Sequence, residues 1–387
     1  MKKIIKLKKG EDKRILLGHL WVFSNEIQEI QSGLQAGDVV DLRKNSGEFL
    51  GKGFYNPNSL IAFRLLTTQD EDIDFQFYKS RIEKSLALRK KLFDNAESFR
   101  LVYGESDFLP GLIIDKYNDY FSVQTFSYGM DKHITLICDV LESIFKPAGI
   151  IRRDESPLRS LEGLTEIKEV VQGKIDPTII TENEIKYQVD LSEGQKTGFF
   201  MDQRENRSAI RRYVKNAKVL DCFCNDGGFA LNAGFAGAAN VFGIDISESA
   251  VKRAQQNAEL NQLADVCKFQ KSDVFDFLKS TDKKYDVVIL DPPSFTKSKK
   301  TITTAKLGYK QINSNAIRSL NSGGILATAS CSHHIDEALF MEVIIKSAKE
   351  AGKKIRLLEW RGASPDHPVL PAMPETKYLK FGIFEVF

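Results

Sequence analysis

Five short apolar runs between Val219 and Cys331 each end on residues suited to chemistry, and this series constrains the fold more than any other feature. The first four runs end on acidic residues or glycines, and the fifth ends on a cysteine. In order, the segments are V-L-D-C-F-C-N-D-G-G (219–228), V-F-G-I-D (241–245), S-D-V (272–274), V-V-I-L-D-P-P (287–293) and I-L-A-T-A-S-C (325–331). Parallel strands deliver the residues at their carboxyl ends to one edge of a sheet, so these residues are expected to meet there.

Helical stretches separate these runs, which is the alternation typical of an α/β protein. The alternating aromatic tail from Tyr378 to Phe387 is predicted to add an edge strand. We therefore expect residues 191–387 to form a doubly wound, Rossmann-like sheet. Its strands are predicted at 219–221, 241–245, 267–270, 287–291 and 324–329, and its clearest helices at 249–260 and 309–320.

The chain before this sheet is predicted to form two further segments, because 387 residues exceed one average domain. Residues 1–72 hold short β-rich runs broken by glycines and by an Asn-Pro-Asn turn, a rhythm typical of a small β-barrel. Residues 73–190 are predicted to form a central α+β domain that opens with a helix over 75–93. The β-rich runs of the first segment are 38–42, 49–54 and 60–66.

The net charge of +3 does not by itself indicate a nucleic-acid partner, but the basic residues are clustered. Residues 2–14 hold seven Lys or Arg, and a second cluster follows the paired prolines. Either cluster could be solvated surface or a face that binds phosphates. The residues predicted to contact RNA are Lys8, Lys9, Arg14, Lys297 and Lys299.

The five cysteines indicate a reducing compartment and no structural metal. No apolar stretch of signal or membrane length follows the basic start, so a cytoplasmic protein with no membrane partner is expected. Cys222 and Cys224 are the only close pair, and no second Cys or His pair stands at zinc spacing.

The glycine-rich turn after the first strand predicts the cofactor. Gly227 and Gly228 stand where backbone approaches a ligand, but the turn lacks the G-x-G-x-x-G of a dinucleotide site. Its carboxylates, Asp221 and Asp226, would repel a pyrophosphate and could receive the ammonium of a methionine moiety. This pattern favours S-adenosylmethionine over NAD.

The later acidic strand ends suit the rest of that cofactor. Asp245 is placed to accept hydrogen bonds from both ribose hydroxyls, and Asp273 could accept one from the adenine amino group. Each acid alone could instead cap a helix, or the fold could bind another ligand. The residues predicted to contact the cofactor are Asp221, Cys222, Phe223, Asn225, Gly227, Asp245, Ile246, Asp273, Val274 and Asp291.

The last two strand ends predict the chemistry. The rigid turn Asp291-Pro292-Pro293 can accept hydrogen bonds from an exocyclic amine, and Phe295 could stack on a planar base. Cys331 would open at the same edge, where its thiolate could add to carbon 6 of a pyrimidine and activate carbon 5 for methylation. Asp291 and Cys331 are thus the predicted catalytic residues, with a packed thiol as the alternative for the cysteine.

These motifs resemble a known family, the bacterial large-subunit rRNA cytosine-C5 methyltransferases with an N-terminal PUA domain. The likeness spans nearly the whole chain. The resemblance implies dependence on S-adenosylmethionine, rRNA or its precursor particle as partner, and Cys331 as nucleophile. It rests on G-H-L-W-V-F (18–23), G-K-G-F-Y-N-P-N-S (51–59), D-F-L-P-G-L-I-I-D (107–115), G-Q-K-T-G-F-F-M-D-Q-R-E-N-R (194–207), L-D-P-P-S-F (290–295), G-Y-K-Q-I-N (308–313) and S-C-S-H-H (330–334).

Two other functions stay open from the sequence. The D-P-P-x-F pattern also resembles enzymes that methylate guanine nitrogens, for which Cys331 would be only structural. A non-catalytic RNA-binding assembly factor is the third reading, which the intact acidic strand ends oppose. The sequence also leaves a homodimer open.

Overall fold

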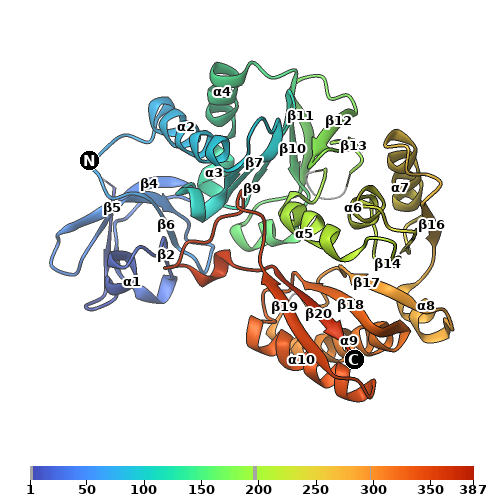
Figure 1. The fold of residues 1–387 in the computed structure, drawn as a ribbon. Coiled ribbons are helices and arrows are strands. Elements are labelled where there is room, and N and C mark those ends of the chain that lie inside the picture. Colours follow the sequence, from blue (N-terminus) through green and yellow to red (C-terminus); the bar gives the residue numbers. More distant parts are fainter. Residues whose placement is uncertain (1–2, 195–197, 297) are drawn as a thin grey trace. The chain divides into compact units, whose positions relative to one another are not determined.

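The computed structural model describes residues 3–194, 198–296 and 298–387, which divide into two compact units (Figure 1). The first unit comprises the described residues of Met1–Ile180, Val189–Met201 and Pro365–Thr376. The second comprises Thr181–Gln188, the described residues of Asp202–Ser364, and Lys377–Phe387. No helix within the described ranges is long and apolar enough to cross a membrane.

The first unit begins with a six-stranded sheet of order β2-β6-β5-β4-β1-β3. Neighbouring strands are antiparallel except β1 and β4, which are parallel. Gly53 in β5 is required by close packing, because a Cβ there would lie 2.0 Å from the carbonyl oxygen of Arg64. The elements are β1 (Ile4–Leu7), α1 (Lys13–Leu16), β2 (Trp21–Val22), η1 (Ser24–Glu26), β3 (Ile27–Ile30), β4 (Asp38–Arg43), β5 (Phe49–Tyr55) and β6 (Phe63–Thr67).

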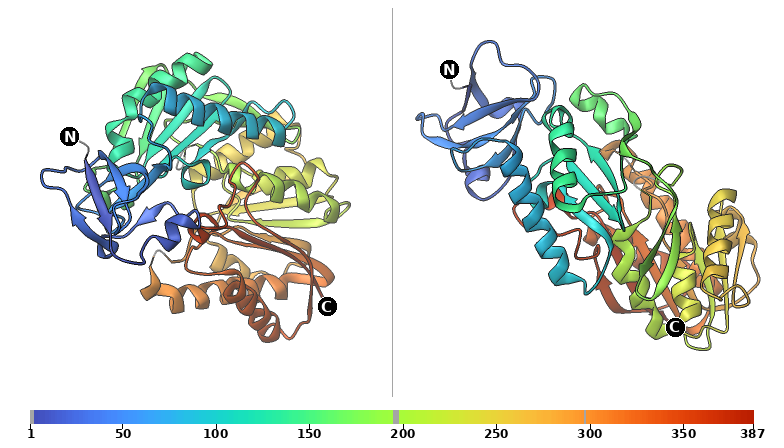
Figure 2. Two further views of the ribbon diagram at one scale, coloured as in Figure 1. Left: turned by 90° about the vertical axis from the view of Figure 1, so that its left-hand side faces the viewer. Right: turned by 90° about the horizontal axis from the view of Figure 1, so that it is seen from above.

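A five-stranded sheet of order β11-β10-β9-β8-β7 follows in the same unit. Helices α2 and α4 pack against each other beside it (Figure 2). The side chain of Asp74 caps α2 by accepting a hydrogen bond from the backbone N–H of Phe77, which fixes where this predicted helix begins. The elements are α2 (Phe75–Leu92), β7 (Ser98–Tyr103), η2 (Gly104–Asp107), β8 (Leu112–Tyr117), β9 (Tyr120–Thr125), α3 (Tyr128–Lys132), α4 (Ile134–Phe145), β10 (Gly149–Asp154), η3 (Pro157–Glu162) and β11 (Ile167–Gly173).

The second unit is built on a seven-stranded sheet of order β16-β15-β14-β17-β18-β20-β19. Strands β14 to β18 are parallel, so the prediction of a doubly wound, Rossmann-like sheet is confirmed. In Figure 1 these strands run from yellow-green to red. They are β14 (Lys218–Cys222), β15 (Asn240–Asp245), β16 (Cys267–Lys271), β17 (Tyr285–Leu290), β18 (Leu320–Ser330), β19 (Ile355–Arg361) and β20 (Lys380–Val386). The hairpin β12 (Thr178–Glu182) and β13 (Ile185–Val189) precedes them.

Helices of this unit form two groups, α5 with α6 and α7, and α8 with α9 and α10. The second group shares one apolar core with alternate strand residues such as Leu220, Val288 and Leu326. The intervening strand residues are buried too, so both faces of the sheet are covered. The elements are η4 (Met201–Gln203), α5 (Arg204–Ala209), η5 (Ile210–Tyr213), α6 (Gly228–Phe235), α7 (Glu248–Leu260), α8 (Val274–Ser280), η6 (Lys299–Thr301), α9 (Ile302–Ser319) and α10 (Glu337–Glu350). The short helix η7 (Pro374–Thr376) belongs to the first unit.

The expectation that the C-terminal tail forms an edge strand is wrong. Strand β20 is antiparallel and lies between β18 and β19, with Thr328 opposite Gly382 and Gly382 opposite Trp360. The edge is β19, a strand that sequence reasoning missed because its apolar residues are interrupted by charges. Residues of β20 are almost all buried, as an interior strand requires, whereas β19 is largely half-exposed.

Candidate active site

The loop between β14 and α6 is held tightly over the carboxyl end of the sheet. Phe223, Asn225 and Gly227 all have positive φ angles, of 63°, 44° and 81°. A Cβ on Gly227 would lie 3.1 Å from the ring of Phe269, so a side chain has little room there. The turn thus brings backbone atoms to the place where a ligand would bind.

Asp221 is the carboxylate at the centre of this loop. Its side chain is fully buried, and Oδ2 accepts a hydrogen bond from the N–H of Ala230 at 2.9 Å. Its Oδ1 has no hydrogen-bond partner among the described residues. Burial raises the pKa of Asp221 well above its usual range, and the nearby carboxylates of Asp291 and Asp245 raise it further. An orphaned, buried acceptor of this kind fits a cationic donor such as the methionine ammonium of S-adenosylmethionine.

Asp226, the other carboxylate of the loop, differs from Asp221 because it is paired within the protein. Its Oδ1 accepts a hydrogen bond from Nε of Arg253 at 2.6 Å; Asp226 is buried and Arg253 is half-buried. The carboxylate is therefore used to fix the loop against α7. Asp221 is then the acid of this loop that has an unpaired oxygen to offer a cation.

Asp245 ends β15 and supports the loop from the next strand. Its Oδ2 accepts a hydrogen bond from the N–H of Asn225 at 3.0 Å, and its Oδ1 accepts one from Ser247 at 2.9 Å. The side chain is half-buried, which leaves its carboxylate open to further donors. Ile246 beside it is 65% exposed and offers apolar surface at the same edge.

The remaining predicted cofactor residues differ in what they can offer. Asp273 caps α8, because its Oδ1 accepts hydrogen bonds from the N–H groups of Phe275 and Asp276 at 2.8 and 3.1 Å. Oδ1 of Asp273 therefore acts as a helix cap, the alternative role considered above, and these two hydrogen bonds do not involve Oδ2. The side chains of Cys222 and Val274 are buried in the apolar core, so both can offer only backbone atoms to a ligand.

The chemical half of the site lies at the ends of β17 and β18, which are neighbours. Sγ of Cys331 lies 3.9 Å from the carbonyl oxygen of Pro292. Cys331 is half-exposed, whereas the other four cysteines are buried. The structure therefore brings Cys331 beside the paired-proline turn, and Asp291 joins that turn to the cofactor loop through its N–H, 3.4 Å from the carbonyl of Cys222.

Gln203 holds Asp291 and was missed as a site residue. Its Nε2 donates a hydrogen bond to Oδ1 of Asp291 at 2.8 Å. Asn206 in turn donates to Oε1 of Gln203 at 2.6 Å. Both belong to the D-Q-R-E-N-R motif, so the motif marked the segment, but no spacing rule indicated that it faces Asp291. Residues 195–197 of the longer motif lie outside the described residues.

Hydroxyl groups surround the turn that follows β18. The hydroxyl of Tyr309 is 2.9 Å from that of Ser332 and accepts a hydrogen bond from Ser330 at 3.0 Å. Ser332 is also 2.9 Å from the hydroxyl of Ser294, which joins this turn to the paired prolines. Phe295 packs with its ring centroid 4.5 Å from that of Tyr309 and is partly buried against the apolar core of this unit, and its stacking on a base stays a prediction.

Lys380 is a buried cation at the same place, and sequence reasoning missed it too. Its side chain donates hydrogen bonds to the carbonyl oxygens of Ser332 at 2.8 Å and Tyr378 at 2.6 Å. Burial lowers the pKa of Lys380 to about 8, while the charge of Cys331 raises it. Nothing in its local sequence distinguishes this lysine from a surface one.

The predicted RNA contacts lie in both units. Arg14 is engaged within the first unit, because its guanidinium pairs with Glu26 at 2.6 Å and lies over the ring of Phe23. Lys8 donates to the carbonyl of Asn25, and Lys9 is exposed. In the second unit Lys299 is exposed at the start of η6, and Lys297 lies outside the described residues.

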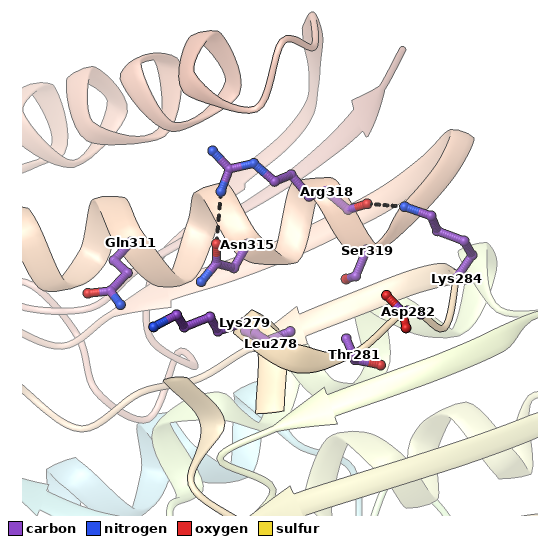
Figure 3. A pocket seen from close by; sticks show the side chains of 9 residues that line it. All are labelled: Leu278, Lys279, Thr281, Asp282, Lys284, Gln311, Asn315, Arg318 and Ser319. Atoms are coloured by element: carbon purple, nitrogen blue, oxygen red, sulfur yellow. Dashed lines mark hydrogen bonds between the residues drawn. The ribbon is translucent and has the colours of Figure 1, made fainter. Parts of the chain in front are cut away.

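A cavity of about 510 Å³ lies elsewhere in the second unit (Figure 3). Helices α8 and α9 line it, together with the segments that lead into β17 and β18. It is therefore at the amino ends of these strands, away from Asp291 and Cys331. The described residues hold no cluster of His, Cys, Asp or Glu that could bind a metal ion.

Comparison with known proteins agrees with this architecture. Residues 5–68 match a PUA-like domain family, and residues 214–364 match a methyltransferase domain family. A protein from Tolumonas auensis named "Ribosomal RNA large subunit methyltransferase I" is 39% identical over 98% of both chains. A protein of the same name from Escherichia coli is 37% identical over 97% of both. The chain belongs to this family.

Solved structures show the same fold at lower identity. A proposed SAM-dependent methyltransferase from Streptococcus mutans superposes over 100% of both chains with a TM-score of 0.84 at 20% identity. A tRNA m1G37 methyltransferase from M. jannaschii covers 84% of this chain and 82% of its own, with a TM-score of 0.53 at 19% identity. At these identities the likeness shows the fold alone.

Proposed function

We propose that this chain is a methyltransferase of large-subunit ribosomal RNA that methylates carbon 5 of a cytosine through a covalent bond to Cys331. Family membership supports the rRNA substrate, and the methyltransferase domain supports S-adenosylmethionine as methyl donor. The observation that carries the cytosine-C5 assignment is the position of Cys331, the one half-exposed thiol, 3.9 Å from the proline turn that follows Asp291.

The acidic strand ends would hold the cofactor along one half of the edge. Asp221 would accept the ammonium on its unpaired Oδ1, Asp245 the ribose hydroxyls, and Asp273 the adenine amino group on its Oδ2. Ile246 would cover one face of the adenine, and the backbone of Phe223, Asn225 and Gly227 would line the loop. S-adenosylmethionine, when bound, supplies the methyl group that carbon 5 receives.

Cys331 would make that carbon nucleophilic. Its thiolate forms a bond from Sγ to carbon 6, and the electrons of the 5,6 double bond become available at carbon 5. After methylation the proton on carbon 5 leaves to a base in solution. The electrons of that C–H bond restore the double bond, the Sγ–C6 bond breaks, and the thiolate is recovered.

Asp291 would orient the base for this attack. A carboxylate accepts a hydrogen bond from the exocyclic amine of cytosine, which uracil lacks. The hydrogen bond from Gln203 occupies Oδ1 and limits how the carboxylate can turn. A flipped cytosine held by Asp291 would then present carbon 6 to the thiol on the neighbouring strand end.

The test is covalent trapping with RNA that carries 5-fluorocytosine. Fluorine cannot leave carbon 5 as a proton does, so the Sγ–C6 bond should persist and appear by mass spectrometry on the peptide that contains Cys331. Cys267→Ala, which removes a buried thiol, should trap as the unaltered protein does. The absence of an adduct, together with methylation of guanine, would replace this proposal with the guanine-nitrogen reading. Absence of any methyl transfer would favour the assembly factor.

A further inference from the structure

Lys380 stands where it can act on the thiol of Cys331. In the antiparallel pair of β18 and β20 it lies opposite Ser330, the residue directly before Cys331. Its Nζ donates to the carbonyl of Ser332, the residue directly after Cys331. Within one structural unit, the backbone of Lys380 is thus paired with the residue before the thiol, and its ammonium is hydrogen-bonded to the residue after it.

The surroundings of Lys380 are unusual for a lysine. Its side chain is 3% exposed, and no carboxylate of the described residues forms an ion pair with it. Its two hydrogen-bond partners are neutral carbonyl groups, which leave one N–H of the ammonium unassigned. A buried ammonium without an anion costs free energy, so the fold gains by placing a negative charge near it.

We propose that Lys380 is a positioning residue that holds Cys331 as a thiolate, ready to attack. The catalytic role of this thiolate rests on the proposed function. The coupling between the two side chains does not, because it can be measured without any methyl transfer. The thiol proton goes to solvent, and Lys380 keeps its three protons throughout. No bond to Lys380 forms or breaks.

Electrostatic reciprocity supports this assignment. A negative charge on Cys331 raises the pKa of Lys380, which burial lowers to about 8. The same coupling free energy must lower the pKa of the Cys331 thiol when Lys380 is charged. The other charged groups that act on Lys380 are Asp336 and Glu337, which raise its pKa, and Lys377, which lowers it. Glu337 pairs with Lys377 at 2.8 Å, and Asp336 caps α10 by accepting a hydrogen bond from the N–H of Leu339. Since neither carboxylate forms an ion pair with Lys380, the thiol beside it is a further site for a negative charge.

The experiment measures the rate of alkylation of Cys331 by iodoacetamide against pH in the full-length protein. The other cysteines are buried, so peptide mass spectrometry follows this thiol selectively. Lys380→Gln keeps a neutral donor and Lys380→Met removes it, and both should raise the pH of half-maximal alkylation by roughly one unit. Lys380→Arg keeps the charge, so its pH of half-maximal alkylation should stay close to that of the wild-type protein. Lys346→Met, at an exposed lysine of the same unit that pairs with Glu342, is the matched control and should move it by no more than a few tenths.

A purely structural role makes the opposite forecast. If Lys380 only ties down carbonyl groups, the alkylation profiles of folded Lys380→Gln and wild-type protein should coincide, and the proposal is then wrong. If the Lys380 variants do not fold, the reverse measurement decides. In Cys331→Ala, acetylation of Lys380 by acetic anhydride should move to lower pH, and an unchanged profile would equally overturn the coupling.

Failure of the cytosine-C5 mechanism gives a different result. Methylation that persists in Cys331→Ala would remove the nucleophile from the proposed function, whatever the alkylation profile shows. Where both hold, the pH at which methylation is half-maximal should rise in Lys380→Gln by the same amount as the alkylation midpoint. A change confined to KM would instead indicate lost RNA binding.

Discussion

The two halves of the strand-end edge hold their functional groups by different means. In the cofactor half, Asp221, Asp245 and Asp273 accept hydrogen bonds from backbone N–H groups, mainly those of their own loops. In the chemical half, Asp291 is held by a glutamine 88 residues earlier in the chain, and the turn after Cys331 by a lysine 48 residues later. Local backbone therefore holds the residues proposed to bind the cofactor, and distant side chains hold those proposed to react. Substitutions in the cofactor half should therefore lower cofactor affinity, and substitutions in the chemical half should lower the rate of methyl transfer.

The largest effect is expected for Cys331→Ala, which should lower methylation of rRNA by roughly 10⁴-fold or more because no other group can add to carbon 6. Affinity for S-adenosylmethionine should stay within about twofold, since the acidic loop contacts are untouched. Methyl transfer from labelled cofactor and calorimetric titration measure the two quantities. Appreciable turnover by the folded variant would restore the packed-thiol reading.

Asp245→Ala should have the opposite effect, because it should weaken the binding of S-adenosylmethionine more than it slows the chemical step. Two ribose hydroxyls would lose an acceptor, and the N–H groups of Asn225 and Ser247 would lose theirs, at a cost of about 1.5–3 kcal/mol in binding. Saturating cofactor should then recover most of the rate. Asp276→Ala, one turn into α8, is a nearby acid for comparison and should change affinity little. An unchanged dissociation constant in folded Asp245→Ala would remove this residue from the site.

Gln203→Leu should affect the rate more than cofactor affinity. Oδ1 of Asp291 would lose its neutral donor, and the carboxylate could turn away from the cytosine, so kcat should fall about 10- to 30-fold. Asn206→Ala, which removes only the support behind Gln203, should give a smaller loss in the same parameter. Steady-state kinetics with saturating cofactor test this order. Equal losses in cofactor affinity would show that Gln203 belongs to the binding half.

What the sequence could predict follows this division. Apolar runs that end on Asp221, Asp245 and Asp273 predicted the parallel sheet and the common edge at which these acids lie, because strand ends and loop backbone are local features. The contacts of Gln203 and Lys380 depend on tertiary structure, so no local pattern indicated them. The same reason explains the wrong expectation for the tail. Whether β20 is an edge or an interior strand depends on β19, whose charged residues concealed its pairing.

The raised pKa of Asp221 predicts a moderate pH effect on cofactor binding. Without bound cofactor, this carboxyl keeps its proton to a higher pH than usual, and the methionine ammonium prefers the carboxylate form. Affinity should therefore fall as pH falls through the raised pKa, by at most about tenfold per pH unit for one proton. Asp221→Asn should weaken binding and remove this slope. Asp226→Asn, whose parent acid pairs with Arg253, should keep it.

The smallest effect is expected in the first unit, where the predicted RNA contacts are surface charges that build no site. Lys8→Gln with Lys9→Gln should weaken rRNA binding a few-fold and lower the slope of log affinity against log salt by about 1.4–1.8, as two lost phosphate contacts require. Surface substitution is preferable to removal of residues 1–72, because Asn56, Ser59 and Arg64 bond the buried Glu162 and their loss would leave that carboxylate unpaired.

Lys174→Gln, at an exposed lysine paired with Asp176, is the charge control. The electrostatic contacts would lie elsewhere if the double variant kept the wild-type salt slope, and the N-terminal sheet would then contribute shape instead of charge to RNA binding. A change in kcat at saturating RNA would contradict the comparison itself, because both halves of the edge are built from residues of the second unit and these lysines belong to the first.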